Sequence, residues 1–205
     1  MKTLTRILLA IVLVVVVIYG IMALVIPTEK TVSRTAELNA PIRVVFEQVN
    51  TMSNWEKWSP WHQIDPNMKI EYANIPSGPG AAYSWESEDP NVGHGSLKID
   101  ESIPNESIHT TLHFEGQSSD GHGTWKFVEK GPDRTEVTWA MAMTFTKKPS
   151  DLMFAAMADM ILGGTFEDGL ENLEEVSQEA AEKQEIQEAA EVLEEDHEMM
   201  EEAEE

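Results

Sequence analysis

The chain has 205 residues, no cysteine, and a formal net charge of −23 from 14 basic and 37 acidic residues. Its length and its 41% apolar content suit one compact domain with appendages. The lack of cysteine excludes disulfides, cysteine-ligated metal sites and thiol nucleophiles. The negative charge argues against nucleic acid as a partner, because phosphates would be repelled and few basic side chains are present to bind them.

The first segment predicts a membrane anchor. Residues 7–26 are twenty residues without a charge, and as a helix they extend about 30 Å, the thickness of the hydrocarbon core of a bilayer. A cleaved signal peptide has a shorter apolar core and a small-residue cleavage site, whereas this run ends in Leu-Val-Ile-Pro. We therefore expect residues 1–28 to form an uncleaved anchor around one transmembrane helix.

The charges that flank this helix predict its orientation. Lys2, Arg6 and the amino terminus precede it, and Glu29, Lys30 and Arg34 follow it. Because basic residues stay preferentially on the cytoplasmic side, this balance favours an amino terminus in the cytoplasm. The C-terminal domain is then expected on the outer side of the cell membrane, periplasmic or extracellular, with a single pass through the bilayer.

The domain is expected to begin with a strand at 31–38 and two short helices. Proline occupies the first helical position of the segment 41–50, which favours a helix start there. The second helix is predicted at 52–61, where three tryptophans recur every third residue: Trp55, Trp58 and Trp61. Aromatic residues at this spacing are usually core, and the alternative is that they line the entrance for a ligand.

Residues 68–146 predict an antiparallel sheet. Their hydrophobic pattern has a period of two and is interrupted by turn signals, which fits six consecutive strands. Turns at 104–105 and 131–133 set the register. The predicted cross-strand pairs are Leu97 with Leu112, Ile99 with Thr110, Asp100 with His109, Ile103 with Glu106, His94 with Glu115, Trp125 with Trp139, and Phe127 with Val137.

A long helix is expected after Ser150, which can cap it. Its apolar residues lie along one side as far as Leu173, and Gly163 and Gly164 would permit a kink. Past Val176 the apolar residues become sparse among glutamates. Residues 178–205 are therefore predicted as an acidic, Glu-rich C-terminal tail, a solvated helix that fades into disorder. A protein partner could bind this tail.

Five motifs complete this order of elements: Asn39-Ala40-Pro41 with Val45-Phe46, Trp55-x-x-Trp58-Ser59-Pro60-Trp61, Gly80-Ala81-Ala82-Tyr83-Ser84-Trp85, Gly93-x-Gly95, and Phe166-Glu167-Asp168-Gly169-Leu170-Glu171-Asn172-Leu173. With them, residues 29–177 resemble the SRPBCC superfamily, the helix-grip group that includes START lipid-transfer domains and polyketide cyclase/dehydrase proteins, and in particular its membrane-anchored bacterial members. The resemblance implies an α+β helix-grip fold. An antiparallel sheet of about seven strands would wrap on a long C-terminal helix, with one transmembrane helix before it. It also implies a cavity, whereas the activities of such proteins range from lipid carriage to cyclisation.

Alternation along the strands and the last helix predicts the side chains that line this cavity. Most are aromatic or flexible apolar groups that can pack around a guest, and a few carry hydroxyl or indole N–H groups that can orient it. The expected ligand is a lipid or another small hydrophobic molecule. The predicted ligand-binding residues are Tyr72, Tyr83, Trp85, Leu97, Thr110, Leu112, Trp125, Phe127, Trp139, Met141, Met143, Phe145, Met157 and Ile161.

No catalytic residue, metal site or cofactor is predicted. The serines and six histidines share no hydrolase motif. Asp159 and Asp168 are the nearest candidates for a general acid or base, and both are more simply explained as solvent-facing helix residues. Four histidines fall on the outer face of the sheet, where cross-strand polar pairing explains them better than a metal does: His94, His109, His113 and His122.

Three functions stay open at this point. The first is a membrane-anchored binding module for a lipid or another small hydrophobic ligand. The second is a non-catalytic partner-interaction domain with a filled core, and the third is a cyclase or dehydratase-type enzyme. Cavity volume separates the first from the second, and a buried ionisable group with a shifted pKa would mark the third.

Overall fold

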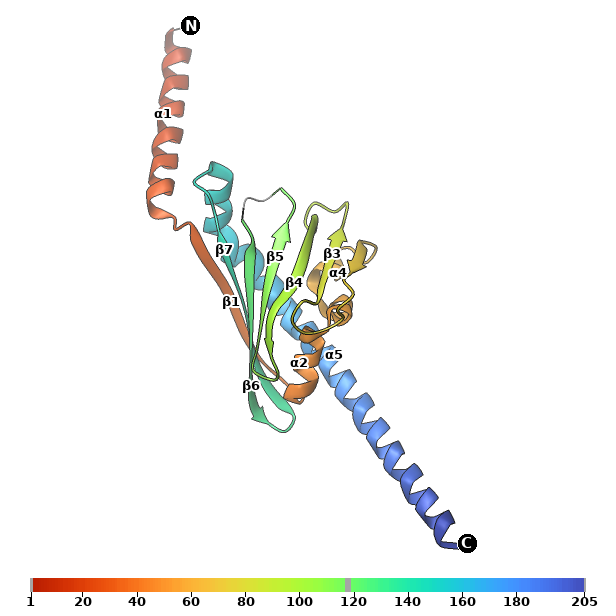
Figure 1. Cartoon of the computed structure of the whole chain (residues 1–205). Helices are drawn as coiled ribbons and strands as arrows, with labels where there is room; N and C mark the ends of the chain where they lie inside the picture. Colours follow the sequence, from red (N-terminus) through yellow and green to blue (C-terminus); the bar gives the residue numbers. More distant parts are fainter. Residues whose placement is uncertain (1, 117–118, 205) are drawn as a thin grey trace.

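The computed structural model describes residues 2–116 and 119–204, and its elements form an α+β arrangement (Figure 1). Helix α1 (Lys2–Val25) projects from one end of a curved antiparallel sheet. Helix α5 (Pro149–Glu204) crosses one face of that sheet and continues far beyond its other end. The helix-grip fold predicted from the sequence is confirmed.

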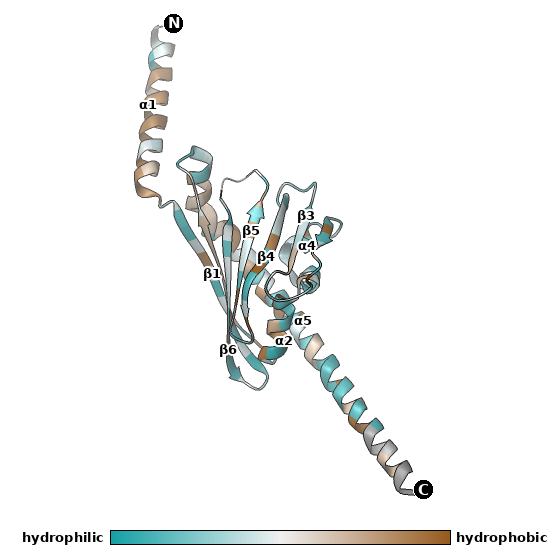
Figure 2. Cartoon of the chain, in the orientation of Figure 1, coloured by the Kyte–Doolittle hydropathy of each residue, from teal (hydrophilic) through white to brown (hydrophobic). Residues whose placement is uncertain are grey.

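Helix α1 exposes its apolar side chains and is strongly hydrophobic along its length (Figure 2). Among the described residues, its segment Thr3–Val25 is the one helix long and apolar enough to cross a membrane. A signal sequence near the amino terminus can meet the same criterion of length and hydropathy, so this observation is weak evidence for an anchor. Most apolar side chains of α1 are not covered by other described residues.

The sheet has seven antiparallel strands in the order β1-β7-β6-β5-β4-β3-β2. Strand β1 pairs with β7 along its whole length, from Glu29 opposite Thr144 to Leu38 opposite Thr135, while the other strands follow chain order. The strand bounds are β1 (Glu29–Leu38), β2 (Lys69–Tyr72), β3 (Ala82–Glu86), β4 (His94–Ile103), β5 (Ser107–Phe114), β6 (Gly121–Gly131) and β7 (Arg134–Thr144).

The predicted register is confirmed in the body of the sheet. Leu97 lies opposite Leu112, Ile99 opposite Thr110, Trp125 opposite Trp139 and Phe127 opposite Val137, and the Glu115 N–H donates to the His94 carbonyl. Two pairs close to the turn at 104–105 are wrong. Ile103 pairs with Ser107 instead of Glu106, and His109 pairs with Glu101 instead of Asp100.

The shape of that turn explains the shift. The Glu106 N–H donates to the Ile103 carbonyl at 3.0 Å, and Asn105 has a φ of 59°, so the turn is of type II, with proline at its second position. Type II turns do not match the twist of a hairpin, and the strands compensate by a one-residue offset. A bulge between Ile99 and Glu101 removes the offset again, which preserves the inward face of β4.

Three short helices and one 3-10 turn connect β1 to β2. They are α2 (Ile42–Asn50), the 3-10 turn Met52–Asn54, α3 (Trp55–Trp58) and α4 (Pro60–Ile64). The sequence predicted one helix at 52–61, and the structure divides it at Ser59, whose ψ of 125° is extended. A residue that precedes proline avoids the helical region because the proline ring would clash with it. Trp61 is therefore carried by α4 and separated from Trp55 and Trp58 on α3.

Helix α5 is held against β1 by an ion-pair cluster. The Arg34 side chain reaches across α5 and contacts Asp159 at 3.0 Å and Glu167 at 2.5 Å. Gly163 makes room for it, since a Cβ there would lie 1.8 Å from Arg34 Nη2. The close approach explains this glycine, and α5 is continuous through it.

The packed part of α5 extends past Val176. Ser177 is fully buried, and Ala180, Ala181 and Gln184 are half-buried, whereas residues 185–194 are exposed. The sequence predicted that helical structure fades in this region, and the structure continues the helix to Glu204. Figure 2 shows this projecting half of α5 as largely hydrophilic.

We expect a chain that ends after Glu188 to unfold at the same urea concentration as the full chain. The described side chains that this truncation removes are exposed, so their loss should cost little. A chain that ends after Asn172 is the control. It lacks Leu173, which is completely buried, and should lose at least about 2 kcal/mol of unfolding free energy. Equal losses in both truncations would contradict the expectation.

Candidate functional site

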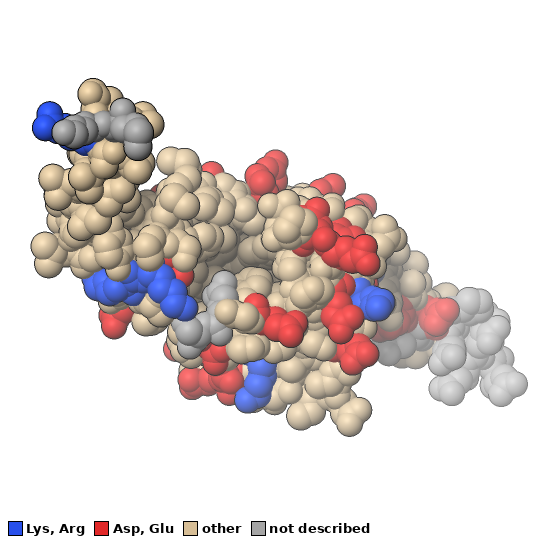
Figure 3. All heavy atoms as spheres, turned by 90° about the horizontal axis from the view of Figure 1, so that it is seen from above, with Lys and Arg blue, Asp and Glu red and all other residues tan. Residues whose placement is uncertain are grey.

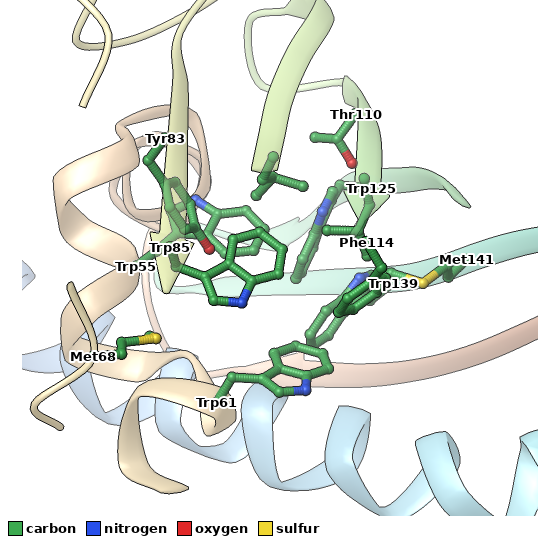
Figure 4. Close-up of a pocket in the computed structure, with 12 residues that line it drawn as sticks. Trp55, Trp61, Met68, Tyr83, Trp85, Thr110, Phe114, Trp125, Trp139 and Met141 are labelled. Atoms are coloured by element: carbon green, nitrogen blue, oxygen red, sulfur yellow. The ribbon is translucent and has the colours of Figure 1, made fainter. Parts of the chain in front are cut away.

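Two adjoining spaces lie between the sheet and the helices. The inner one is a pocket of about 40 Å³ that lies among aromatic side chains (Figure 4). The outer one is a groove of about 620 Å³. The residues that line both spaces, and so join them, are Trp61, Leu112, Phe114 and Met141.

Stacked aromatic rings occupy most of the inner space. Trp125 and Trp139 lie opposite each other on β6 and β7, and their rings stack at 4.4 Å with an interplanar angle of 19°. Trp139 also stacks on Phe166 of α5 at 4.1 Å. Trp55 from α3 and Trp61 from α4 complete the wall on the helix side. What is left has room for a few atoms, since a single water needs about 10–15 Å³.

The inner pocket has no charged side chain among its described lining residues, and its polar groups are hydroxyls and indole nitrogens. Two of the indoles are satisfied, because Trp55 Nε1 donates to the Val49 carbonyl at 2.9 Å and Trp85 Nε1 to the Val92 carbonyl at 3.3 Å. Tyr83 donates to no described residue. Burial raises the pKa of the Tyr83 phenol, so this hydroxyl keeps its proton at physiological pH.

The groove opens at the end of the sheet nearest to α1. Its walls come from the β3–β4 loop, the ends of β5 and β7, and the first half of α5. In Figure 1 the β3–β4 loop, the ends of β5 and β7 and the beginning of α5 lie at the end of the domain from which α1 projects. Gly121 faces this space, since a Cβ there would make only ordinary contacts, 3.7 Å from Met141 Sδ and 3.8 Å from Leu112 Cβ.

The structure brings most of the sequence-predicted cavity residues to these two spaces. Eight line the inner pocket: Tyr83, Trp85, Leu97, Thr110, Leu112, Trp125, Trp139 and Met141. Three more line the groove: Met143, Phe145 and Ile161. The predicted inward face of the sheet is therefore the face that carries the candidate site.

Three predicted residues line neither space. Tyr72 lies on the short edge strand β2, is 42% exposed, and donates its hydroxyl to the Glu56 carboxylate. Phe127 is buried, but it packs edge-on against Phe46 of α2 at 5.3 Å, away from the groove. Met157 is 41% exposed on α5.

Sequence reasoning left four lining residues of the inner pocket out of the predicted set: Trp55, Trp61, Met68 and Phe114. Phe114 continues the alternation of Thr110 and Leu112 and was detectable from that pattern. For Trp55 and Trp61, the spacing supported a core role and a ligand-entrance role at once. The separation of α3 from α4 at Ser59 directs both rings to the pocket, and no periodicity in the sequence signals that break.

The acidic residues considered as an acid or base are directed away from the pocket. Asp159 binds Arg34, which lowers the pKa of Asp159 and raises that of Arg34, so this carboxylate is ionised and paired at the edge of the sheet. Asp168 is exposed. On the outer face, His113 Nδ1 contacts Asp120 at 2.8 Å, and among the described residues no three histidines or carboxylates gather as a metal site.

His62 is a buried histidine beside the aromatic cluster. It is 7% exposed on α4, its ring lies 6.3 Å from that of Tyr83, and neither ring nitrogen has a hydrogen-bond partner among the described residues. Burial lowers the pKa of His62 from 6.5, and the charge of Glu56 opposes this shift more weakly. The folded protein therefore holds a neutral imidazole.

We expect His62 to make the fold less stable in mild acid. In the unfolded chain His62 takes up a proton near pH 6.5, whereas the folded chain resists protonation until a lower pH. Between the pKa of His62 in the folded chain and about pH 6.5, the unfolded chain binds more protons than the folded chain. The stability that the neutral His62 contributes is therefore lost as the pH falls below about 6.5. Urea unfolding at pH 7.5 and pH 5.5 should show a larger loss for the wild type than for His62→Phe. Equal losses would contradict the expectation.

Comparison with known proteins places this fold. Residues 29–178 match the profile of the family described as polyketide cyclase / dehydrase and lipid transport. The chain belongs to this family. The resemblance to the SRPBCC superfamily is thereby confirmed, and both α1 and most of the acidic tail lie outside the matched residues. No protein of curated function matches the chain.

Solved structures of low sequence identity share the fold of the family domain. A START superfamily protein from Mycobacterium smegmatis is 18% identical, with a TM-score of 0.51, over 73% of this chain and 98% of that one. A protein from Thermus thermophilus is 17% identical, with a TM-score of 0.55, over 74% of this chain and 99% of that one. At this identity the likeness supports the fold, and the function has to be argued from the site.

Proposed function

We propose that the protein is a membrane-anchored binding module that holds a lipid or another small hydrophobic molecule in the groove between the sheet and α5. The observation that carries the proposal is the groove itself. Its volume of about 620 Å³ lies within the range of known small-molecule sites, and apolar residues of β7 and α5 line it. The family profile, which includes lipid transport, supports the same class of ligand.

The contact between α1 and the domain supports delivery from a bilayer. The Tyr19 hydroxyl donates to the Lys147 carbonyl at 2.9 Å, and Lys147 Nζ donates to the carbonyl oxygens of Ala23 at 2.8 Å and Ile26 at 3.3 Å. Lys147 lies in the loop between β7 and α5, beside the groove residue Phe145. If α1 spans a membrane, these bonds hold the mouth of the groove next to its surface.

The surface around this mouth suits a position at a bilayer. On the first turns of α5, Met153 is 58% exposed and Met160 is 77% exposed. Figure 3, which looks down on this end, shows basic groups beside α1 and acidic groups spread over the rest of the visible face. Apolar and basic groups near the anchor would favour the interfacial region, while the acidic remainder would stay in water.

We expect the full chain to remain in the membrane after washing with alkaline carbonate, because α1 is long enough to span the hydrocarbon core and no partner in the described chain covers it. Immunoblotting of the pellet and the supernatant measures this. A shorter, soluble chain that begins near Pro27 would instead identify α1 as a cleaved signal sequence.

The alternative function is an interaction domain with a filled core, and the small volume of the inner pocket favours it. A photoreactive diazirine phospholipid in vesicles, with the full chain reconstituted, separates the two. Under our proposal, peptide mapping finds label on α1 and on groove residues such as Phe145 and Ile161. A filled core gives label on α1 alone.

Gly121→Leu provides the matched variant. Its side chain should extend into the groove without displacing the strand, because the Cβ position is free of close contacts. Lys126→Leu adds the same side chain to the exposed face of β6 and is the control. We expect Gly121→Leu to abolish labelling in the groove and to leave labelling of α1 unchanged. Equal groove labelling in both variants would contradict the proposal.

A further inference from the structure

The inner pocket contains polar groups that the protein leaves unused. The Tyr83 hydroxyl, the Thr110 hydroxyl and the Trp139 indole N–H make no hydrogen bond to a described residue, although Thr110 is 3% exposed and Trp139 is 2% exposed. Their polar atoms are not enclosed by protein, because the completely buried side-chain nitrogen and oxygen atoms without a partner among the described residues belong to His62, Ser177 and Gln184. They therefore face the space of the pocket, where a water molecule or a ligand can pair with them. Figure 4 shows these side chains around the pocket together with Trp125, whose indole N–H is also unpaired among the described residues.

The Thr110 hydroxyl lies close to the backbone of Gly123 on the neighbouring strand β6. Thr110 lies opposite Gly123 on β6, and a Cβ at Gly123 would lie 2.2 Å from Thr110 Oγ1. The glycine thus gives the hydroxyl its space on the inward face of the sheet. If this side chain served only to fill space, valine, which has a methyl group in place of the hydroxyl, would pack equally well.

The hydrogen-bonding character of these neutral groups limits what they can bind. An indole N–H is only a donor, and the two hydroxyls can donate, so the common partner is an acceptor. The described lining residues of the inner pocket include no lysine, arginine or histidine. An anionic head, such as a carboxylate or a phosphate, would therefore lose its hydration without a compensating charge.

We propose that the inner pocket recognises a neutral carbonyl oxygen, of the kind found in a ketone, a quinone or an ester, at one end of the hydrophobic molecule that occupies the groove. This inference rests on the proposed function, since the body of the ligand needs the groove. The volumes agree with it: about 40 Å³ accommodates a carbonyl group, and the adjoining 620 Å³ accommodates an apolar body. Trp61, Leu112, Phe114 and Met141 line the passage between the two.

The test uses three competitors of equal chain length against the diazirine phospholipid: a long-chain methyl ketone, the corresponding alkane and the corresponding carboxylate. Protection of the groove from labelling is measured for the full chain in detergent and for a double variant, Tyr83→Phe with Thr110→Val. Both substitutions keep the side-chain shape and remove one donor. Comparing ketone with alkane on each protein cancels their unequal partition into detergent.

We expect the double variant to lower the preference for ketone over alkane about tenfold, as expected for the loss of two ordinary hydrogen bonds. Protection by the alkane should stay the same, which shows that the groove is intact. A ketone labelled with ¹³C at its carbonyl adds a direct readout. Its infrared band should lie at lower frequency on the wild type than on the variant, because a hydrogen bond weakens the C=O stretch.

The outcomes distinguish this inference from the function beneath it. If ketone and alkane protect the groove equally on the wild type and on the double variant, the carbonyl inference is overturned and the binding function stands. If the carboxylate protects better than the ketone, the inference is also overturned. If none of the three protects, the binding function and the inference both fail.

Discussion

Replacing Trp139 by alanine should lower the free energy of unfolding by about 3–5 kcal/mol, the range for truncating a buried tryptophan. Trp139 is 2% exposed and stacks on Trp125 at 4.4 Å and on Phe166 at 4.1 Å. It therefore joins the sheet to α5 through one ring. Alanine would leave a cavity at this junction and remove both stacking contacts at once.

Urea unfolding of the full chain in detergent measures the effect. Met153→Ala is the control, because this side chain is 58% exposed on α5 and its loss should change the free energy of unfolding by less than about 0.5 kcal/mol. A cost below about 1 kcal/mol for Trp139→Ala would mean that the ring does not connect sheet and helix as described.

The same substitution should have opposite effects at two glycines of α5. A Cβ at Gly169 would lie 2.8 Å from Trp139 Cζ3 and 3.0 Å from Pro60 Cγ, so Gly169→Ala should force the helix outward and cost about 1–3 kcal/mol. At Gly164 a Cβ would meet nothing within 4 Å. Gly164→Ala should stabilise the fold by up to about 1 kcal/mol, because alanine favours the helix.

Thermal and urea unfolding of the two variants give the sign directly. If both variants stabilise the protein, the close packing of α5 on Trp139 is refuted. If both destabilise it, helix propensity does not govern the exposed face of α5. The expected result is that Gly169→Ala destabilises the protein and Gly164→Ala stabilises it, because the two glycines face opposite sides of the same helix.

The strands of the sheet were predictable because a half-buried strand alternates and a turn fixes its register. Trp125 opposite Trp139 was predicted from a three-residue turn at 131–133. The structure has that pair, but Gly131 is itself paired with Arg134, and a register shift between Glu129 and Gly131 compensates for the shorter turn. At the turn 104–105 the prediction assumed a two-residue hairpin loop. The type II conformation of Asn105 and the bulge near Asp100 change the register locally, and neither follows from the period of the hydrophobic pattern.

The candidate site was predictable on its sheet side and much less so on its helix side. Alternation gave Tyr83, Trp85 and Trp139, since each strand has only two faces. Along α5, a helical stripe shows which residues are apolar but not how far the helix is rotated toward the sheet. Met157 accordingly lines neither space and Ile161 lines the groove, although the two side chains are about equally exposed.

Glycines shape the inner pocket and the groove, and the pattern of large apolar side chains in the sequence does not indicate this role. Gly95 yields its space to the Trp85 ring, since a Cβ there would lie 2.6 Å from it, and Gly123 yields to Thr110. Gly121 leaves its space to the groove. The concave face of the sheet is thus defined as much by missing side chains as by the aromatic ones.

The most direct measurement of the binding function is native mass spectrometry of the full chain extracted from its membrane in mild detergent. The wild type should retain a non-covalent hydrophobic molecule, and Gly121→Leu, with unchanged thermal stability, should be free of it. A wild-type chain that carries no such molecule, or one that carries the same molecule as Gly121→Leu, would contradict the account of the groove as a ligand site.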